Sequence, residues 1–492
     1  MDQYEGLEMS NTRPNIVYIL ADDMGYGDVG CYNPQSKIPT PYMDRLAREG
    51  MRFTDAHSPS AVCTPTRYGI LTGRYCWRTE LKAHVLFNYE LPLIEPERVT
   101  VASLLKNCGY HTGCFGKWHL GLGWGVKDGE VFDFDQPLPW PGGSPDPVEE
   151  DKIDFSKPIA GGPVALGFDR FYGTSGCSTA QPPYCFIDQD QTVGIPSVQK
   201  PVEMAGGRRG LMVPDWDHKE ADPAFTEKAV AYIEERAKDE DTPFFLYLAA
   251  SAPHEPCTVA CVPEFLRGAS EAGPRGDMVA LVDWMVGQVM DALDRCGLAD
   301  DTLVIVTSDN GALPGCNGRT YGHKSCGDWR GFKGYIWEGG HREPFIARWP
   351  GVVAPNSVCD ALVGLQDFMA TVADIVGETL PEDAGEDSAS FLPALMGENE
   401  PVRDDLIHHS CMGVFSIRRG DWKLIVDCDN SGDMGRGVDG CAGTGPVPGA
   451  RGQLYHMGDD PFESYNKFNQ ESGIVCEFRE MVERYIADGR SV

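Results

Sequence analysis

Two pairs of polar residues follow apolar runs that are typical of buried strands. Residues 15–20 precede Asp22 and Asp23, and residues 302–307 precede Asp309 and Asn310. Short apolar runs of this kind favour parallel strands that are covered on both faces. Adjacent carboxylates repel each other unless a cation lies between them, so the four side chains offer an all-oxygen site for calcium or magnesium. Taken separately, each pair could also be a polar turn after a strand.

A pentapeptide with the pattern Cys-x-Pro-x-Arg runs from Cys63 to Arg67. An isolated cysteine in such a chain is most often a small buried apolar residue. Gly69 and Gly73 indicate a helix that begins just after Cys63, and the N-terminus of a helix favours a bound anion. The pentapeptide alone therefore does not indicate a function, and the other segments of the chain have to be considered with it.

Three further segments carry basic side chains. Lys117 and His119 alternate with Trp118, so an extended backbone would place both on one face. His254 follows an apolar run at residues 244–250, and Lys333 lies in the segment at residues 329–344. Alone, Lys117 would be a surface lysine and His119 a core histidine.

Taken together and in this order, the segments resemble the formylglycine-dependent sulfatases, arylsulfatase A-like members of the alkaline phosphatase superfamily. The resemblance implies that a formylglycine-generating enzyme oxidises Cys63 to an aldehyde. One hydroxyl of the hydrated aldehyde attacks sulfur, and the second then expels sulfate. The resemblance also implies one calcium ion rather than magnesium, bound by a set of five residues: Asp22, Asp23, Cys63, Asp309 and Asn310.

The same resemblance implies a role for each basic residue. Arg67 orders the formylglycine, a task that a fixed fork of donors suits. Lys117 binds the hydrate and a sulfate oxygen, and His119 takes a proton when the intermediate collapses, which suits a near-neutral pKa. His254 faces the leaving group as hydrogen-bond donor or general acid, and Lys333 neutralises charge on the sulfate.

One residue departs from the family pattern. Glu343 stands where the family commonly has an apolar residue. The departure leaves Lys333 unchanged but makes the packing near Pro344 harder to predict.

The elements that must hold these side chains predict an α/β fold. Strand candidates alternate with helical segments, so we expect a large, mostly parallel, alkaline phosphatase-like sheet sandwiched by helices. Asp22, Asp309 and His254 would then lie beyond the carboxyl ends of strands. The predicted helices lie at residues 44–49, 101–107, 223–237 and 276–298.

The pattern of predicted elements changes after about residue 387, and the chain is predicted to have three parts. They are an N-terminal lead at residues 1–14, a catalytic domain at 15–386 and a smaller α+β subdomain at 387–492. The subdomain should contain antiparallel strands at residues 406–409, 414–419 and 422–426 and a helix at 474–487. Segments 121–163 and 175–190 are predicted to form loops over the pocket.

Charge and composition exclude some partners. The chain has 74 acidic and 42 basic residues and a net charge of −32, which argues against nucleic acid or an anionic membrane. No leader or membrane-spanning run is visible, so we expect a soluble cytoplasmic protein, or a secreted or periplasmic one if a leader was removed. The 17 cysteines permit disulfides without requiring them.

Three functions are compatible with these observations. The first is hydrolysis of a sulfate ester, of a sulfated carbohydrate or an aryl sulfate. The second is a phosphonate or phosphodiester hydrolase, although those relatives generally have histidine where this chain has Asn310, which favours the sulfatase. The third is an inactive binding protein with the same fold.

Overall fold

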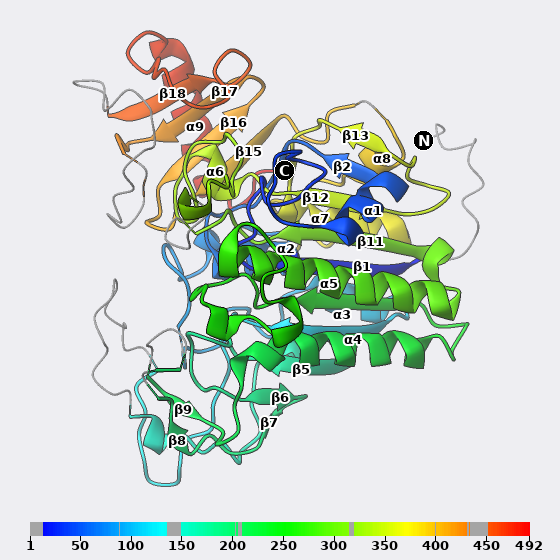
Figure 1. Cartoon of the computed structure of the whole chain (residues 1–492). Helices are drawn as coiled ribbons and strands as arrows, with labels where there is room; N and C mark the ends of the chain where they lie inside the picture. Colours follow the sequence, from blue (N-terminus) through cyan, green and yellow to red (C-terminus); the bar gives the residue numbers. More distant parts are fainter. Residues whose placement is uncertain are drawn as a thin grey trace.

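The computed structural model describes residues 13–87, 89–134, 149–201, 203–204, 209–313, 319–398, 400–430, 432 and 451–492. Its largest feature is a mostly parallel sheet of ten strands (Figure 1). In spatial order the strands are β13 (Ser357–Cys359), β2 (Met51–Phe53), β12 (Phe345–Arg348), β11 (Thr302–Ser308), β1 (Asn15–Ala21), β10 (Phe244–Ala249), β4 (His111–Lys117), β5 (Arg170–Thr174), β6 (Phe186–Asp188) and β7 (Gln191–Val193).

The central strands are parallel and buried on both faces. Every residue of β1 is buried, as the continuous apolar run predicts. In register, Leu20 of β1 lies beside Ala249 of β10 and Thr307 of β11. The segments that follow these three strands therefore emerge at the same edge of the sheet.

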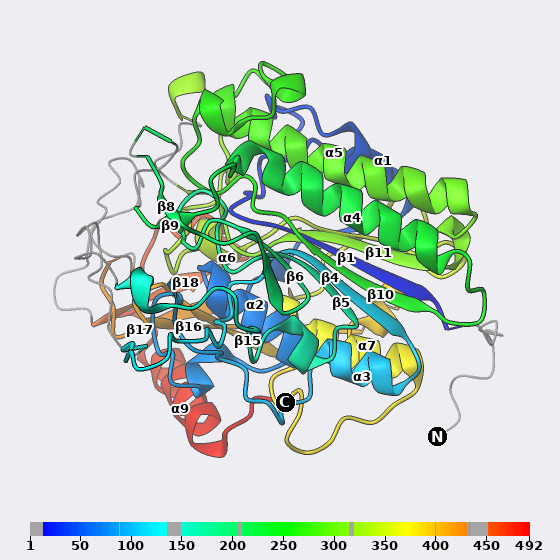
Figure 2. The ribbon, with the colours of Figure 1, turned by 90° about the horizontal axis from the view of Figure 1, so that it is seen from below.

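Helices cover both faces of the sheet (Figure 2). Ile16, Tyr18 and Leu20 pack with α2 (Cys63–Thr72), α3 (Val101–Asn107) and α7 (Phe368–Val376). Val17, Ile19 and Ala21 pack on the other face with α1 (Pro41–Glu49), α4 (Ala221–Arg236) and α5 (Gly273–Cys296). Alternate residues of one strand thus belong to two separate cores.

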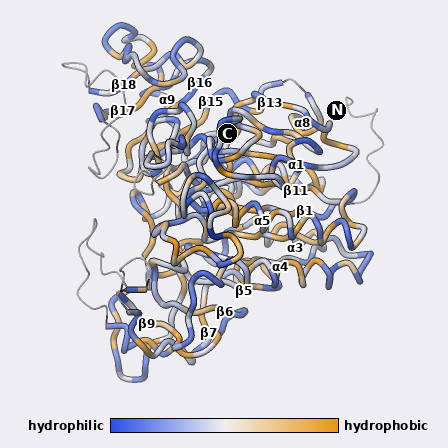
Figure 3. Tube along the Cα trace, in the orientation of Figure 1, coloured by the Kyte–Doolittle hydropathy of each residue, from blue (hydrophilic) through white to orange (hydrophobic). Residues whose placement is uncertain are grey.

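The helix α4 shows how the sequence specifies this packing. Its buried residues include Phe225, Ala229 and Ile233, which recur every four positions and form one apolar face. Hydrophobic and hydrophilic stretches alternate along the helix in Figure 3.

A second, antiparallel sheet lies in the C-terminal part of the chain. It contains β15 (Asp405–His409), β16 (Phe415–Arg419), β17 (Trp422–Val426) and β18 (Gly452–His456), and α9 (Ser472–Asp488) packs against it. The prediction of a large helix-covered sheet with a smaller antiparallel one is confirmed, although β18 and α7 were not predicted. Residues 1–12 of the predicted lead and 135–148 of the predicted loop lie outside the described residues.

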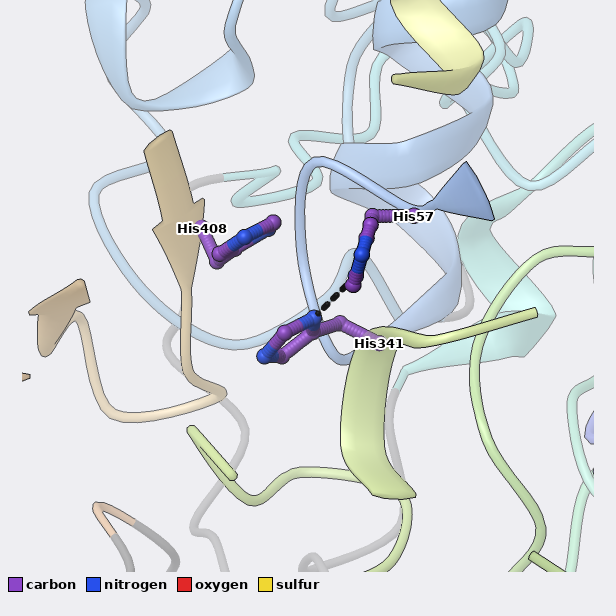
Figure 4. A group of neighbouring side chains, drawn as sticks. All are labelled: His57, His341 and His408. Atoms are coloured by element: carbon purple, nitrogen blue, oxygen red, sulfur yellow. Dashed lines mark hydrogen bonds between the residues drawn. The ribbon is translucent and has the colours of Figure 1, made fainter. Parts of the chain in front are cut away.

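Three buried histidines from three separate elements lie close together (Figure 4). Their source elements are β3 (Ala56–His57), α6 (Glu338–His341) and β15. His57 Nδ1 is 3.0 Å from His341 Nδ1, and the ring of His408 stacks on that of His341 at 3.9 Å and 13°. The lone pair of an imidazole nitrogen lies in the plane of the ring, so two parallel stacked rings cannot both direct a lone pair at one metal ion. Lys423 Nζ is also 3.0 Å from His341 Nε2, so an ammonium group already lies against one of the nitrogens that a cation would need. We therefore interpret the cluster as a packing contact between elements.

Two further observations concern the helices and the cysteines that the structure describes. None of the described helices combines the length and apolar character that crossing a membrane would require. None of the fifteen cysteines within the described ranges forms a disulfide with another of them.

Candidate active site

The ends of β1 and β11 bring four oxygen-bearing side chains together. Ala21 pairs with Ser308, so Asp22 and Asp23 emerge beside Asp309 and Asn310. All four side chains are fully buried. Asn310 Nδ2 donates a hydrogen bond to Asp23 Oδ1 at 2.7 Å, and the backbone N–H of Asp23 donates to Asp309 Oδ1 at 3.3 Å.

This cluster has the chemistry of a hard-cation site. Asp22 Oδ1, Asp23 Oδ2 and Asn310 Oδ1 are buried acceptors without a hydrogen-bond partner among the described residues. Such acceptors are costly unless a cation or a donor satisfies them. Burial and the charge of Asp22 raise the pKa of Asp309 to about 6, because like charges crowd the site. The residues present therefore fit a divalent cation that prefers oxygen ligands, such as calcium.

Cys63 lies against the same cluster. It is the first residue of α2, and its Sγ and carboxylate oxygens of Asp22 and Asp309 all lie within 4.8 Å of one another. Burial raises the pKa of the Cys63 thiol. The helix ends at Thr72, where Gly73 adopts a φ of 65° and its N–H donates to Gly69 O. A helix is thus present where the glycines predicted one; it begins at Cys63 itself, contains Gly69 and is capped by Gly73.

Arg67, a buried residue of α2, links this helix to the oxygen cluster through hydrogen bonds. Its Nε and Nη2 donate to Asp309 Oδ2 at 3.0 and 2.8 Å, and its Nη1 donates to the carbonyl of Lys117 at 2.8 Å. The side chain is fully buried, so these bonds hold it in one orientation. Its planar fork of donors makes three hydrogen bonds to two acceptors, Asp309 Oδ2 and the Lys117 carbonyl, that a lysine could not reach together.

Two lysines bring positive charge to the cluster. Lys117, the last residue of β4, contacts Asp22 Oδ2, and Lys333 contacts Asp23 Oδ1. Burial alone would lower the pKa of each lysine, but the neighbouring carboxylates raise both pKa values above the ordinary range. Both ammonium groups are therefore charged beside Cys63.

His119 differs from the prediction in two respects. The strand β4 ends at Lys117, and His119 has a φ of 61°, so the expected extended segment is wrong. Burial, together with the charges of Lys117 and Arg67, holds the pKa of His119 well below its ordinary value, not near neutrality. Its Nε2 lies 2.7 Å from the carbonyl oxygen of Leu86, to which it donates in the tautomer with the hydrogen on Nε2. In that tautomer Nδ1, which has no partner among the described residues, is the proton acceptor.

His254 lies at the rim of the cluster. It follows β10, and one of its ring nitrogens lies within 4.8 Å of carboxylate oxygens of Asp22 and Asp23. Its Nδ1 is 2.9 Å from the carbonyl oxygen of Glu255 and 3.1 Å from Cys177 Sγ. The structure therefore brings His254 together with the other predicted site residues.

Two residues near the site were missed by the sequence analysis. Cys177 contacts His254, and Gln181 Nε2 lies 2.8 Å from His119 Nε2. Both lie in the segment at residues 175–190, which the sequence placed over the pocket without distinguishing any side chain. No motif marks them, because their partners are distant in the chain.

The position of Glu343 has a physical explanation. Its side chain is fully buried, and burial raises the pKa of Glu343 well above its ordinary value. Ser58 Oγ contacts its Oε1 at 3.4 Å, while Oε2 has no partner among the described residues. A neutral carboxylic acid can occupy a position where an apolar residue is common, because it brings no charge into the core.

Comparison with known proteins identifies one family. The protein-family model named Sulfatase matches residues 14–378, well over half of the chain. An N-acetylgalactosamine-6-O-sulfatase of Bacteroides thetaiotaomicron is 34% identical, with 96% of this chain and 93% of that protein covered. Human arylsulfatase A is 32% identical over 94% of this chain and 85% of its own length. Rat steryl-sulfatase is 33% identical over 82% of this chain and 74% of its own length.

Solved structures give the same result. One, described under the metabolism of multiple glycosaminoglycans by Bacteroides thetaiotaomicron, has a TM-score of 0.80 and 30% identity, covering 96% of this chain and 99% of that one. A sulfatase from a Pseudoalteromonas species has a TM-score of 0.71 at 24% identity, which shows the shared fold alone. The chain therefore belongs to the sulfatase family and is a sulfuric ester hydrolase with the alkaline phosphatase-like fold.

Proposed function

We propose that this sulfatase hydrolyses the sulfate ester of a carbohydrate or an aryl alcohol, using a formylglycine derived from Cys63 and one calcium ion. The observation that carries the proposal is the surroundings of Cys63. A buried arginine, two charged lysines and a cluster of unsatisfied oxygen ligands converge on the first residue of a helix. Maturation would require a formylglycine-generating enzyme as partner.

The proposed calcium ligands are Asp22, Asp23, Asp309 and Asn310 together with the modified Cys63. Three of these residues have a buried oxygen that lacks a hydrogen-bond partner among the described residues. When bound, calcium would supply positive charge that stabilises the sulfate oxygens and the nucleophile. The amide of Asn310 suits a single oxygen-bound cation and offers no imidazole for a zinc-like ion.

The remaining site residues have roles that follow from their positions. Formylglycine at residue 63 supplies, as its hydrate, one hydroxyl to attack sulfur and a second to expel sulfate. Lys117 and Lys333 hold the sulfate oxygens and stabilise the charge that develops on them. Arg67 fixes the backbone of Lys117 and the carboxylate of Asp309.

Two histidines move protons in this proposal. The neutral His119 ring accepts the proton of the second hydroxyl as that hydroxyl expels sulfate, in the tautomer whose Nε2 donates to the Leu86 carbonyl and whose Nδ1 is free to accept. His254 donates a proton to the departing oxygen of the alcohol. Burial lowers the pKa of His254, but the neighbouring Cys177 raises it to about 10, so the ring is protonated near neutral pH.

For the substrate we propose a sulfated carbohydrate first, with 6-O-sulfated N-acetylgalactosamine as the leading candidate. Support comes from the N-acetylgalactosamine-6-O-sulfatase that is similar over 96% of this chain. Aryl sulfates are the second class, because arylsulfatase A is similar at 32% identity. A phosphonate or phosphodiester hydrolase and an inactive binding protein are the alternatives.

A substrate panel separates these functions. The protein, produced together with a formylglycine-generating enzyme, is assayed on N-acetylgalactosamine 6-sulfate, 4-nitrophenyl sulfate, a phenyl phosphonate ester and a phosphodiester. We expect hydrolysis of sulfate esters, abolished by Cys63→Ala and kept by Cys114→Ala, which changes a buried cysteine of β4. Turnover of the phosphorus esters alone would support the first alternative, and failure to turn over any substrate would support the second.

A further inference from the structure

Cys177 is a buried cysteine beside His254. It lies between β5 and β6, and its Sγ is 3.1 Å from His254 Nδ1 and 3.0 Å from Thr179 Oγ1. Thr179 Oγ1 in turn donates to the carbonyl of Glu255 at 2.8 Å. The sulfur therefore faces the ring of His254, and its loop is hydrogen-bonded to Glu255, the residue after His254.

A second set of bonds fastens this loop to the segment that carries His254. Ser178 contacts Ser251 twice, through the two hydroxyl oxygens at 2.8 Å and through its backbone N–H to Ser251 Oγ at 3.2 Å. The backbone N–H of Cys177 donates to Gln181 Oε1 at 2.7 Å. The position of the sulfur relative to the ring is thus fixed from both sides.

The contacts of the His254 ring define which nitrogen carries a hydrogen. The carbonyl of Glu255 is only an acceptor, so Nδ1 at 2.9 Å must donate. Cys177 Sγ, at 3.1 Å from the same nitrogen, is then a second acceptor for that hydrogen. Nε2 is the ring nitrogen left for a substrate.

We propose that Cys177 is a positioning residue whose sulfur accepts the Nδ1 hydrogen of His254 and thereby directs Nε2 toward the leaving oxygen of the sulfate ester. This inference rests on the proposed function, in which His254 protonates that oxygen. Charge supports it: burial alone would raise the pKa of Cys177, but His254 lowers it to about 6. A sulfur with thiolate character is a stronger acceptor than a neutral thiol and stabilises the protonated ring.

The test compares two esters in four matured proteins: wild type, Cys177→Ala, Cys177→Ser and Cys185→Ala. Cys185 is the control, since it is buried in an apolar cluster and lies on the same loop. An alkyl or sugar sulfate needs protonation of the leaving oxygen, whereas 4-nitrophenyl sulfate does not. We expect Cys177→Ala to lower kcat/KM roughly 10- to 100-fold on the alkyl sulfate, part of the roughly 10²- to 10⁴-fold effect of a general acid, and only slightly on the aryl sulfate.

Cys177→Ser keeps an acceptor near Nδ1 and should retain most of the activity on the alkyl sulfate. A double-mutant cycle then tests whether Cys177 acts through His254. In a His254→Ala background, Cys177→Ala should have no further effect on either ester.

Several results would overturn the inference. They are equal losses on both esters, unchanged kinetics in Cys177→Ala, or an additive loss in the His254→Ala background. Failure of the proposed function would look different, because the matured wild type would then hydrolyse neither ester.

Discussion

Arg67 is the residue at which the structure makes its most quantitative prediction. Its guanidinium makes three hydrogen bonds of 2.8 to 3.0 Å, two to Asp309 Oδ2 and one to the carbonyl of Lys117. In the variant Arg67→Lys the charge remains, but a single ammonium on a shorter stem reaches one of these two acceptor groups. At least one strong contact is lost, and Asp309 or the Lys117 carbonyl is left buried without its donor.

The expected cost follows from these contacts. A hydrogen bond to a charged group contributes about 1.5–3 kcal/mol, and an unsatisfied buried acceptor costs about 1–3 kcal/mol. Arg67→Lys should therefore lower the free energy of unfolding by roughly 3–5 kcal/mol, in the range typical of a broken buried ion pair. Because Arg67 also fixes Lys117 and Asp309, we expect kcat/KM on 4-nitrophenyl sulfate to fall by about 10²-fold, the effect of a misplacement near 1 Å.

Urea unfolding at fixed calcium, together with aryl sulfate kinetics, measures both effects. Arg45→Lys is the matched control, since Arg45 makes its ion pairs with Glu49 and Asp294 at the surface. Such pairs contribute about 0–1 kcal/mol, so the control should change little. Wild-type stability and wild-type kinetics in Arg67→Lys would refute the assignment of Arg67 as the buried link between α2 and the cation cluster.

Three other predictions concern the metal, the leaving group and pH. Asp22→Ala should remove one divalent cation per chain, measured by elemental analysis, and abolish turnover; a wild-type metal content would contradict the ligand assignment. His254→Ala should reduce kcat/KM on an alkyl sulfate far more than on 4-nitrophenyl sulfate, and equal losses would rule out the general-acid role. Asp283 lies in α5 and accepts hydrogen bonds from the backbone N–H groups of Tyr42 and Met43 at the start of α1. Burial raises the pKa of Asp283 to about 7, so the stability that its bound proton contributes is present below about pH 4 and is lost as the pH rises through about 7. The Tm of Asp283→Asn should consequently lie above that of the wild type at about pH 8 and equal it near pH 4. A higher Tm of the wild type at about pH 8 would contradict this and show that the carboxylate is needed to cap α1.

Much of the arrangement was predictable because local patterns specify it. The apolar runs before Asp22 and Asp309 predict buried parallel strands, and parallel strands end at the same edge of a sheet. That rule alone brings the two acidic pairs together, as the pairing of Ala21 with Ser308 shows. The helix at Cys63 followed from its glycines.

The remaining features depend on contacts that no local pattern contains. His119 leaves the strand in a left-handed conformation, which the alternation of Lys117 and His119 does not reveal. Cys177 meets His254 only because two segments distant in the chain fold beside each other. The neutral state of Glu343 depends on its complete burial, which a single sequence does not show. The predicted domain boundaries stay a prediction.

The central claim is that a formylglycine at residue 63 performs the reaction, and peptide mass spectrometry combined with activity tests it most directly. Preparations made with graded amounts of a formylglycine-generating enzyme are digested, and the fraction of aldehyde or hydrate at Cys63 is compared with the specific activity on 4-nitrophenyl sulfate. We predict that activity rises in proportion to this fraction and extrapolates to zero when only the thiol is present. A preparation that contains only unmodified Cys63 and still hydrolyses the ester at full rate would contradict the account.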